Sequence, residues 1–220
     1  MSFVGFLNVV TLYPAEKAAF FHDYKSAGAR YSSATFLTAF SVFAIVPEVL
    51  ASLVFTVLVN VATGMQTDAR IFLEFAAAIW MQLNFGESVG IMFATFFDTM
   101  GLAVSLVSLF LTMAAQSSGV FSASVIPFLG DIAWIFPVKY LPRILLINEM
   151  TGLAFNCSQE SIQSGECIAA TGEQVLQTFG FHDSTARLLV ISLVITVAYR
   201  FLAWLFLVVR SVDFNNLQLT

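Results

Sequence analysis

Long apolar stretches separated by short polar connectors dominate the chain after residue 33. The most continuous of them cover 34–62, 71–97, 102–115 and 186–209. A helix needs about 20 apolar residues to cross the hydrocarbon of a bilayer, and 102–115 is the only stretch below that length, so we interpret it as the beginning of a span. A tight turn at 98–101 joins it to the preceding stretch as a helical hairpin. We therefore predict three transmembrane helices within 34–115 and a last one over 186–210.

The first 33 residues have an apolar start and a polar continuation. Residues 1–12 are apolar but too short for a span. We interpret them as the end of a truncated transmembrane helix, with a short helix at the membrane surface as the alternative. Residues 13–33 carry several charges and an amphipathic Phe20-Phe21 pair, which favours a cytoplasmic surface helix. The polar tail at 211–220 is assigned to the same side.

The region 116–185 has a different character from the rest of the chain. Its apolar part is interrupted by Pro127, Gly130, Asp131 and Pro137. Broken backbone at membrane depth is tolerated only where protein or water covers it, which predicts a re-entrant or interfacial segment. An amphipathic stretch at 145–155 follows, and a capping-box spacing from Thr171 to Gln174 predicts a short helix that ends near Gly180. The fold class expected is an all-α, polytopic helical membrane domain with re-entrant or interfacial helices in a large external loop before the last span.

Composition supports a membrane location. Hydrophobic residues make up 59% of the chain, charged residues 10%, and the mean hydropathy is +0.87. A soluble domain carries about a quarter charged residues, because its surface faces water. The net charge of −5 excludes a broad basic surface for nucleic acid. We expect a multi-pass integral protein of the plasma membrane or an internal membrane, in contact with lipid.

The distribution of basic residues orients the chain. Lys17, Lys25 and Arg30 lie in 13–33, and Arg210 ends the last span. The rule that short cytoplasmic loops are rich in Lys and Arg places both regions in the cytoplasm, so the loop 116–185 is expected to be non-cytoplasmic.

That loop holds both cysteines. On an oxidising side of the membrane, Cys157 and Cys167 are expected to form a disulfide. Their spacing is not that of a Cys-x-x-Cys motif, and no histidine lies near enough to complete a zinc site. Asn156 begins a formal glycosylation sequon, although its middle residue is cysteine.

Two acids interrupt the predicted spans. Glu48 follows Pro47, and Glu87 lies between Gly86 and Gly90. An ionisable group in hydrocarbon needs a partner or a water-filled path, so both are functional candidates. The alternative is that both are structurally satisfied by nearby polar groups. The G-x-x-x-G spacing allows close helix contact, but on its own it is weak evidence. Arg200 is interpreted as an anchor that reaches toward the cytoplasmic surface.

No catalytic or metal-binding constellation is recognisable. The chain contains no G-x-x-x-x-G-K-[ST] loop, no H-E-x-x-H motif and no nucleophile elbow. Its histidines, His22 and His182, lie in different regions and are not expected to converge. We therefore predict no catalytic residues, no metal and no cofactor in this chain, and no ATP hydrolysis by this chain alone.

Several short motifs occur in the order and spacing of a known family. They are Glu16-Lys17, Phe21-His22-Asp23-Tyr24, Gly28, Tyr31-Ser32-Ser33, Pro47-Glu48, Gly64, Ser118-Gly119-Val120, Lys139-Tyr140-Leu141-Pro142-Arg143, Asn148-Glu149-Met150, Cys157, Cys167, Thr171-Gly172-Glu173 and Ala198-Tyr199-Arg200. In these features the chain resembles the membrane domain of G-type ATP-binding-cassette exporters, the white and pleiotropic-drug-resistance group. The resemblance runs from the end of that domain's second helix to its sixth.

The resemblance implies a homo- or heterodimeric exporter with a central cavity for lipidic or amphipathic molecules. A nucleotide-binding domain, in the same or a separate polypeptide, would hold ATP and Mg. Glu16, Lys17 and Asp23 would contact that ATPase domain. The family's cavity and gate map onto a further set of positions, which are Ser108, Leu111, Thr112 and Ala115 for the cavity and Val120 and Phe121 for the gate.

Two other hypotheses remain open. One is a non-transporting membrane scaffold or truncated product that pairs with other helices. The other is an intramembrane enzyme built on Glu48 and Glu87, although no nucleophile or metal-ligand set joins them in the sequence.

Overall fold

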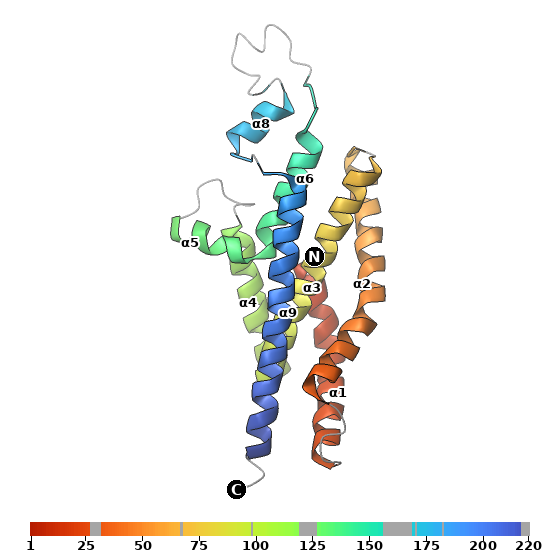
Figure 1. The fold of residues 1–220 in the computed structure, drawn as a ribbon, viewed down its shortest axis with the longest axis vertical. Coiled ribbons are helices and arrows are strands. Elements are labelled where there is room, and N and C mark those ends of the chain that lie inside the picture. The colour runs from red at the N-terminus through yellow and green to blue at the C-terminus, as the bar shows by residue number, and fades with distance from the viewer. Residues whose placement is uncertain are drawn as a thin grey trace.

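The computed structural model describes residues 1–26, 32–66, 68–97, 99–118, 127–155, 169, 171–181 and 183–216. These residues form an elongated helical bundle (Figure 1). Its elements are α1 (Ser2–Ser26), α2 (Ser33–Thr63), α3 (Ala69–Phe96), α4 (Met100–Ser117), α5 (Pro127–Ile132), the 3-10 turns η1 (Ala133–Ile135) and η2 (Pro137–Lys139), α6 (Tyr140–Met150), α8 (Gly172–Thr178) and α9 (Thr185–Asn216). The described part contains no strand, which agrees with the predicted all-α class.

Helix α3 occupies the centre of the bundle. It packs against α1, α2, α4, α6 and α9. Most of its side chains from Phe75 to Thr95 are buried. Helix α2 ends and α3 begins toward the end of the molecule where α6 and α8 lie, while α3 ends and α4 begins toward the other end (Figure 1). This arrangement is the alternation of up and down helices that the sequence predicted for 34–115.

Local sequence explains where the long helices begin and end. The Ser32 hydroxyl accepts a hydrogen bond from the Thr35 amide at 3.2 Å and so caps α2. Gly64 ends α2 with a φ of +66°, a left-handed conformation that glycine adopts without strain. The Asp68 carboxylate caps α3 by accepting from the Arg70 amide at 2.8 Å. Thr171 caps α8 in the same way, by accepting a hydrogen bond from the Gln174 amide.

The helix α1 differs from the sequence prediction. We expected a break between residues 1–12 and 13–33, but α1 continues through Pro14 to Ser26. Proline removes one backbone hydrogen bond from a helix interior. Contacts with α3 on both sides of it hold the helix in place: Tyr13 and Thr95 share a hydroxyl hydrogen bond of 2.8 Å, and Lys17 donates to the Ala94 carbonyl at 2.8 Å.

Backbone atoms of α1 and α3 lie in direct contact. A Cβ atom at Gly86 would stand 1.8 Å from the Ser2 carbonyl oxygen, and one at Gly5 would stand 2.0 Å from the Leu83 carbonyl oxygen. A Cβ at Gly90 would meet the side chains of Phe6 and Val9. The G-x-x-x-G spacing at Gly86 and Gly90 therefore does mark a close helix contact, and the partner is α1.

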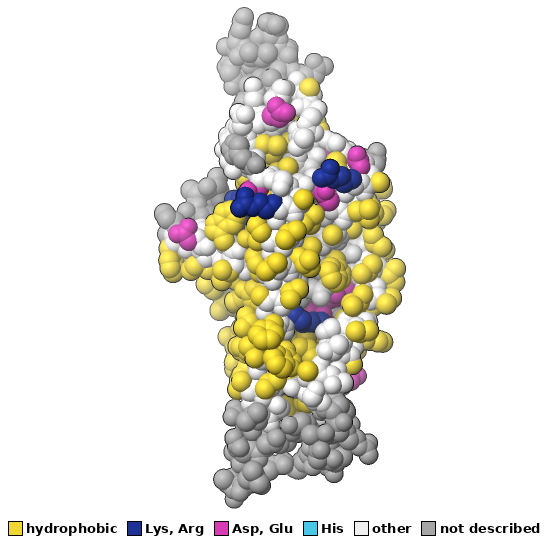
Figure 2. Space-filling model, viewed as in Figure 1, with side chains coloured by type: hydrophobic (Ala, Val, Ile, Leu, Met, Phe, Trp, Pro, Cys, Tyr) yellow, Lys and Arg dark blue, Asp and Glu magenta, His cyan; other side chains and the backbone are white. Residues whose placement is uncertain are grey.

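The outer surface is apolar along the middle of the molecule. Hydrophobic side chains cover most of this part of the visible face (Figure 2). Among the described residues, α2 and α9 are long and apolar enough to cross a membrane. Helices α3 and α4 coincide with the other two predicted spans, but α4 is short and α3 is largely buried and carries acids. The lipid crossing by α3 and α4 stays a prediction.

Helix α6 and the 3-10 turn η2 pack against α3 and α9. Helix α6 begins at Tyr140, five residues before the predicted amphipathic stretch. The Asn148 amide donates to Glu74 of α3 at 3.0 Å. Lys139 lies 3.9 Å above the Trp134 ring and donates to the Gly130 carbonyl at 2.9 Å. Burial and the neighbouring Arg143 guanidinium lower the pKa of Lys139 from its ordinary value.

Candidate functional site

A cluster of four polar side chains lies inside the bundle, where α2, α3 and α9 meet. It consists of Glu48 from α2, Asn84 and Glu87 from α3, and Arg200 from α9. Asn84 donates to Glu48 Oε2 at 2.6 Å, and Arg200 donates to Glu87 Oε2 at 2.8 Å. Glu48 is only 5% exposed and Glu87 is fully buried. We name these four residues the charge cluster.

The positions of these residues along their helices bring them together. Asn84 and Glu87 are three residues apart on α3, so they share one helical face. Pro47 cannot donate to the carbonyl one turn before it, and α2 changes direction partway along its length (Figure 1). Glu48 follows that proline and points inward. The cluster thus joins three helices inside the bundle.

Arg200 corrects a prediction. The sequence suggested an anchor that reaches the cytoplasmic surface, but its guanidinium pairs with Glu87 inside the bundle. Arg200 lies ten residues from Arg210, which corresponds to about 15 Å of helix. A buried carboxylate 113 residues away in sequence is therefore a nearer partner than the membrane surface. The sequence does contain a clue to this pairing. Glu48 and Glu87 also lie inside predicted spans, and an arginine within a membrane helix tends to pair with such an acid.

Three buried polar atoms of the charge cluster have no hydrogen-bond partner among the described residues. They are Glu48 Oε1, Glu87 Oε1 and Arg200 Nη1, one of the two terminal guanidinium nitrogens. Glu48 is brought to the same place as Glu87 because its partner Asn84 lies one helical turn before Glu87 on α3. Asn84 and Arg200 thus hold one oxygen of each carboxyl group and leave the other oxygen without a partner among the described residues. A functional role for Glu48 and Glu87 stays a prediction.

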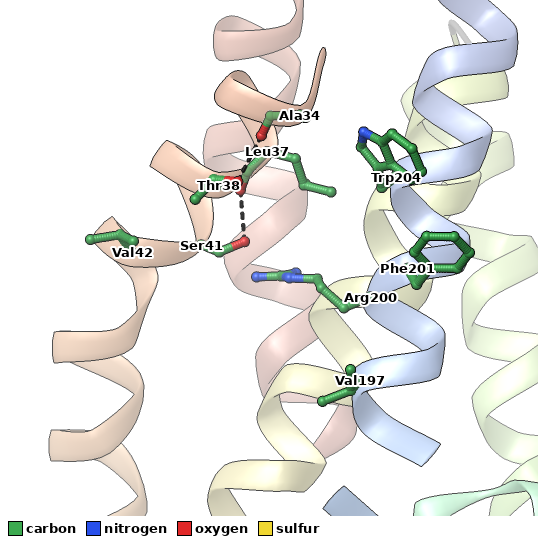
Figure 3. Close-up of a pocket in the computed structure, with 9 residues that line it drawn as sticks. All are labelled: Ala34, Leu37, Thr38, Ser41, Val42, Val197, Arg200, Phe201 and Trp204. Atoms are coloured by element: carbon green, nitrogen blue, oxygen red, sulfur yellow. Dashed lines mark hydrogen bonds between the residues drawn. The ribbon is translucent and has the colours of Figure 1, made fainter. Parts of the chain in front are cut away.

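A groove between α2 and α9 begins beside the charge cluster. Its volume is about 410 Å³, and its lining consists of Ala34, Leu37, Thr38, Ser41, Val42, Val197, Arg200, Phe201 and Trp204. Arg200 extends across it from α9 toward Ser41 on α2 (Figure 3). The hydroxyls of Thr38 and Ser41 each donate to a carbonyl one turn earlier, at 2.7 Å. The groove is thus mostly apolar, with one charged side chain at its wall.

The four predicted cavity residues on α4 differ in their exposure. Leu111 is buried among Phe85, Val107 and Phe136, whereas Thr112 is exposed. Ser108 and Ala115 are half-buried. The Thr112 hydroxyl donates to the Ser108 carbonyl at 2.7 Å, as a lone hydroxyl in a membrane helix usually does. The assignment of these residues to a substrate cavity stays a prediction, with Thr112 as its most accessible member.

The remaining candidates are divided between described and undescribed residues. Glu16 is exposed on α1, and Lys17 is half-buried against α3. The side chain of Asp23 lies outside the described part, as do Val120, Phe121, Asn156, Cys157 and Cys167, so the gate, sequon and disulfide stay predictions. The described residues contain no group of three or more His, Cys, Asp or Glu side chains able to hold a metal ion.

Comparison with known proteins agrees with the membrane-domain architecture. Residues 1–150 match the family described as ABC-2 type transporter. Over 207 residues the chain is 29% identical to an uncharacterized ABC transporter ATP-binding protein/permease of Saccharomyces cerevisiae. That alignment covers 93% of this chain and 16% of the yeast protein, so the chain spans only a small part of its relative's length. The family match covers more than half of the chain, which therefore belongs to the ABC-2 type transporter family.

Proposed function

We propose that this chain forms the membrane pathway of an ATP-driven exporter that moves lipidic or amphipathic small molecules by alternating access. The family match supports a transport role. The order of motifs in the sequence is the support for the finer parts of the proposal, which are the export direction, the substrate class and the G-type subgroup. A nucleotide-binding domain supplies ATP hydrolysis with its own ATP and Mg, and a second membrane half completes a homo- or heterodimer.

The continuity of α1 is the observation that carries this proposal. One unbroken helix runs from Ser2, whose hydroxyl donates to Gln82 inside the bundle at 3.0 Å, to Ser26. The exposed Glu16 lies on the same helix, beyond the contact between Tyr13 and Thr95. A rigid helix transmits a displacement along its axis. A push by an ATPase domain on the Glu16 region would therefore reach α3 and the helices packed around it.

The apolar interior supports the proposed substrate class. Besides the groove at Arg200, a cavity of about 170 Å³ is lined only by apolar side chains, which are Val89, Met92, Phe93, Phe96, Phe110 and Phe206. Sites for amphipathic ligands combine apolar walls with few polar groups. Exposed Thr112 on α4 fits such a wall in a cavity formed with a second membrane half.

We expect Glu16→Ala to uncouple ATP hydrolysis from substrate. In the complete transporter, this change should reduce substrate-stimulated ATPase activity about tenfold, the effect of losing one charged hydrogen bond at the contact. Glu173→Ala, which removes an exposed acid from α8 in the external region, is the matched control and should leave the stimulation intact. Equal stimulation in both variants would show that the Glu16 region does not contact the ATPase domain.

A bulky side chain at position 112 should block the pathway. Thr112→Trp is expected to abolish transport in vesicles because the indole fills the cavity, while the protein still inserts and folds. Met113→Trp is the control, because Met113 is also exposed but lies about 100° around α4. If Thr112→Trp transports normally, this face of α4 contacts lipid and the cavity assignment is wrong.

A further inference from the structure

The charge cluster does not balance if every group is ionised. Glu48 and Glu87 would carry two negative charges, and Arg200 supplies one positive charge. Asn84, the other polar member, is neutral. Among the described residues, Lys17 and Lys139 are bound elsewhere, to the carbonyls of Ala94 and Gly130. An unbalanced charge at this depth is costly, so the cluster requires one additional positive charge.

The hydrogen bonds of the cluster show where that charge belongs. One oxygen of each carboxyl group already accepts a hydrogen bond, from Asn84 in Glu48 and from Arg200 in Glu87. The other oxygen of each group, Oε1, is buried and accepts no hydrogen bond from any described residue. Asn84 and Glu87 share one face of α3, so the carboxyl group that Asn84 holds lies in the same cluster as that of Glu87. Two ionised carboxylates can only accept hydrogen bonds and would repel each other. A proton on the unpartnered oxygen of one carboxyl group would turn that group into a hydrogen-bond donor.

We propose that Glu48 and Glu87 bind a single proton between them, which makes the charge cluster neutral inside the bundle. Arg200 already binds Glu87 as its cation, so the proton resides on Glu48, whose Oε1 then becomes a donor within the charge cluster. A metal ion fits this position poorly, because hard cations take about six oxygen ligands and only two carboxyl oxygens are free here. Two carboxyl groups in contact commonly share one proton.

Infrared spectroscopy of the complete protein in lipid nanodiscs at neutral pH tests the proposal. The carbonyl stretch of a protonated carboxylic acid is resolved from that of a carboxylate. The wild-type protein should show one such acid. Glu48→Gln should lose it, because the glutamine amide provides the donor to Glu87 and no proton is needed. Glu87→Gln should lose the same signal, because Glu48 then becomes the sole ionised partner of Arg200.

The control is Glu74→Gln, which removes an acid of α3 that pairs with Arg70 outside the charge cluster. This variant should keep the signal. Absence of the acid signal in wild-type protein, or its persistence in Glu48→Gln, would overturn the proposal. A signal that is present only after sodium is replaced by a bulky organic cation at constant pH would instead identify a sodium site. None of these outcomes depends on transport or on the ATPase domain.

Discussion

Replacing Arg200 with methionine is expected to destabilise the protein by about 3 kcal/mol. The change leaves Glu87, which is fully buried, without its cation. Breaking a buried ion pair by removing one partner costs about 3–5 kcal/mol. We expect the lower end of that range because the two neighbouring carboxyl groups can bind another proton. The measurement is the free energy of unfolding of the purified protein in detergent, and a combined Arg200→Met and Glu87→Gln variant should recover part of the loss.

The matched control for this prediction lies on the same helix. Arg187 also pairs with an acid, Asp183, but the distance is 3.4 Å and the two side chains are 71% and 32% exposed. Exposed pairs contribute about 0–1 kcal/mol. Arg187→Met should therefore change the free energy of unfolding by less than about 1 kcal/mol. If Arg187→Met and Arg200→Met lowered the free energy of unfolding by similar amounts, burial of the Arg200–Glu87 pair would not determine its contribution to stability.

Adding one methyl group at Gly86 should be as damaging as losing the ion pair. Gly86→Ala places a Cβ 1.8 Å from the carbonyl oxygen of Ser2, and a backbone atom cannot rotate away. Helix α1 would have to move off α3, with loss of the Ser2–Gln82 hydrogen bond. Overpacking of this kind typically costs about 1–3 kcal/mol, and contact with backbone favours the upper limit. Thermal unfolding in detergent would measure the effect.

Gly101→Ala separates this steric effect from the general effect of removing a glycine. No atom lies within 4 Å of the Cβ position at Gly101, which is in the first turn of α4. Alanine is favoured over glycine in a helix by about 1 kcal/mol, so this variant should be neutral or slightly more stable. If Gly86→Ala unfolded at the same temperature as Gly101→Ala, the close approach of α1 to α3 would be refuted.

The sequence by itself determined the class of protein and the location of most helices. Apolar stretches with few charges are stable as helices in lipid, because only a helix or a closed barrel satisfies every backbone hydrogen bond there. The predicted spans at 34–62 and 186–209 accordingly fall within α2 and α9, and the span at 71–97 ends one residue beyond α3. The order of short motifs indicated the membrane domain of an ATP-binding-cassette transporter. The match to the ABC-2 type transporter family confirms this membership, without the subgroup. These properties depend on composition, length and local spacing, all of which can be seen in a single stretch of chain.

Only the tertiary structure decided which faces meet. Glu87 and Arg200 are separated by 113 residues, and neither span shows locally that its charged residue faces the other. The same limit applies to Leu111 and Thr112, adjacent residues of which one enters the core and the other is exposed. Helix α1 passes Pro14 unbroken because contacts from Thr95 and Ala94 hold both sides of it. Each outcome depends on how helices rotate and pack against one another, and that packing is a property of the whole bundle.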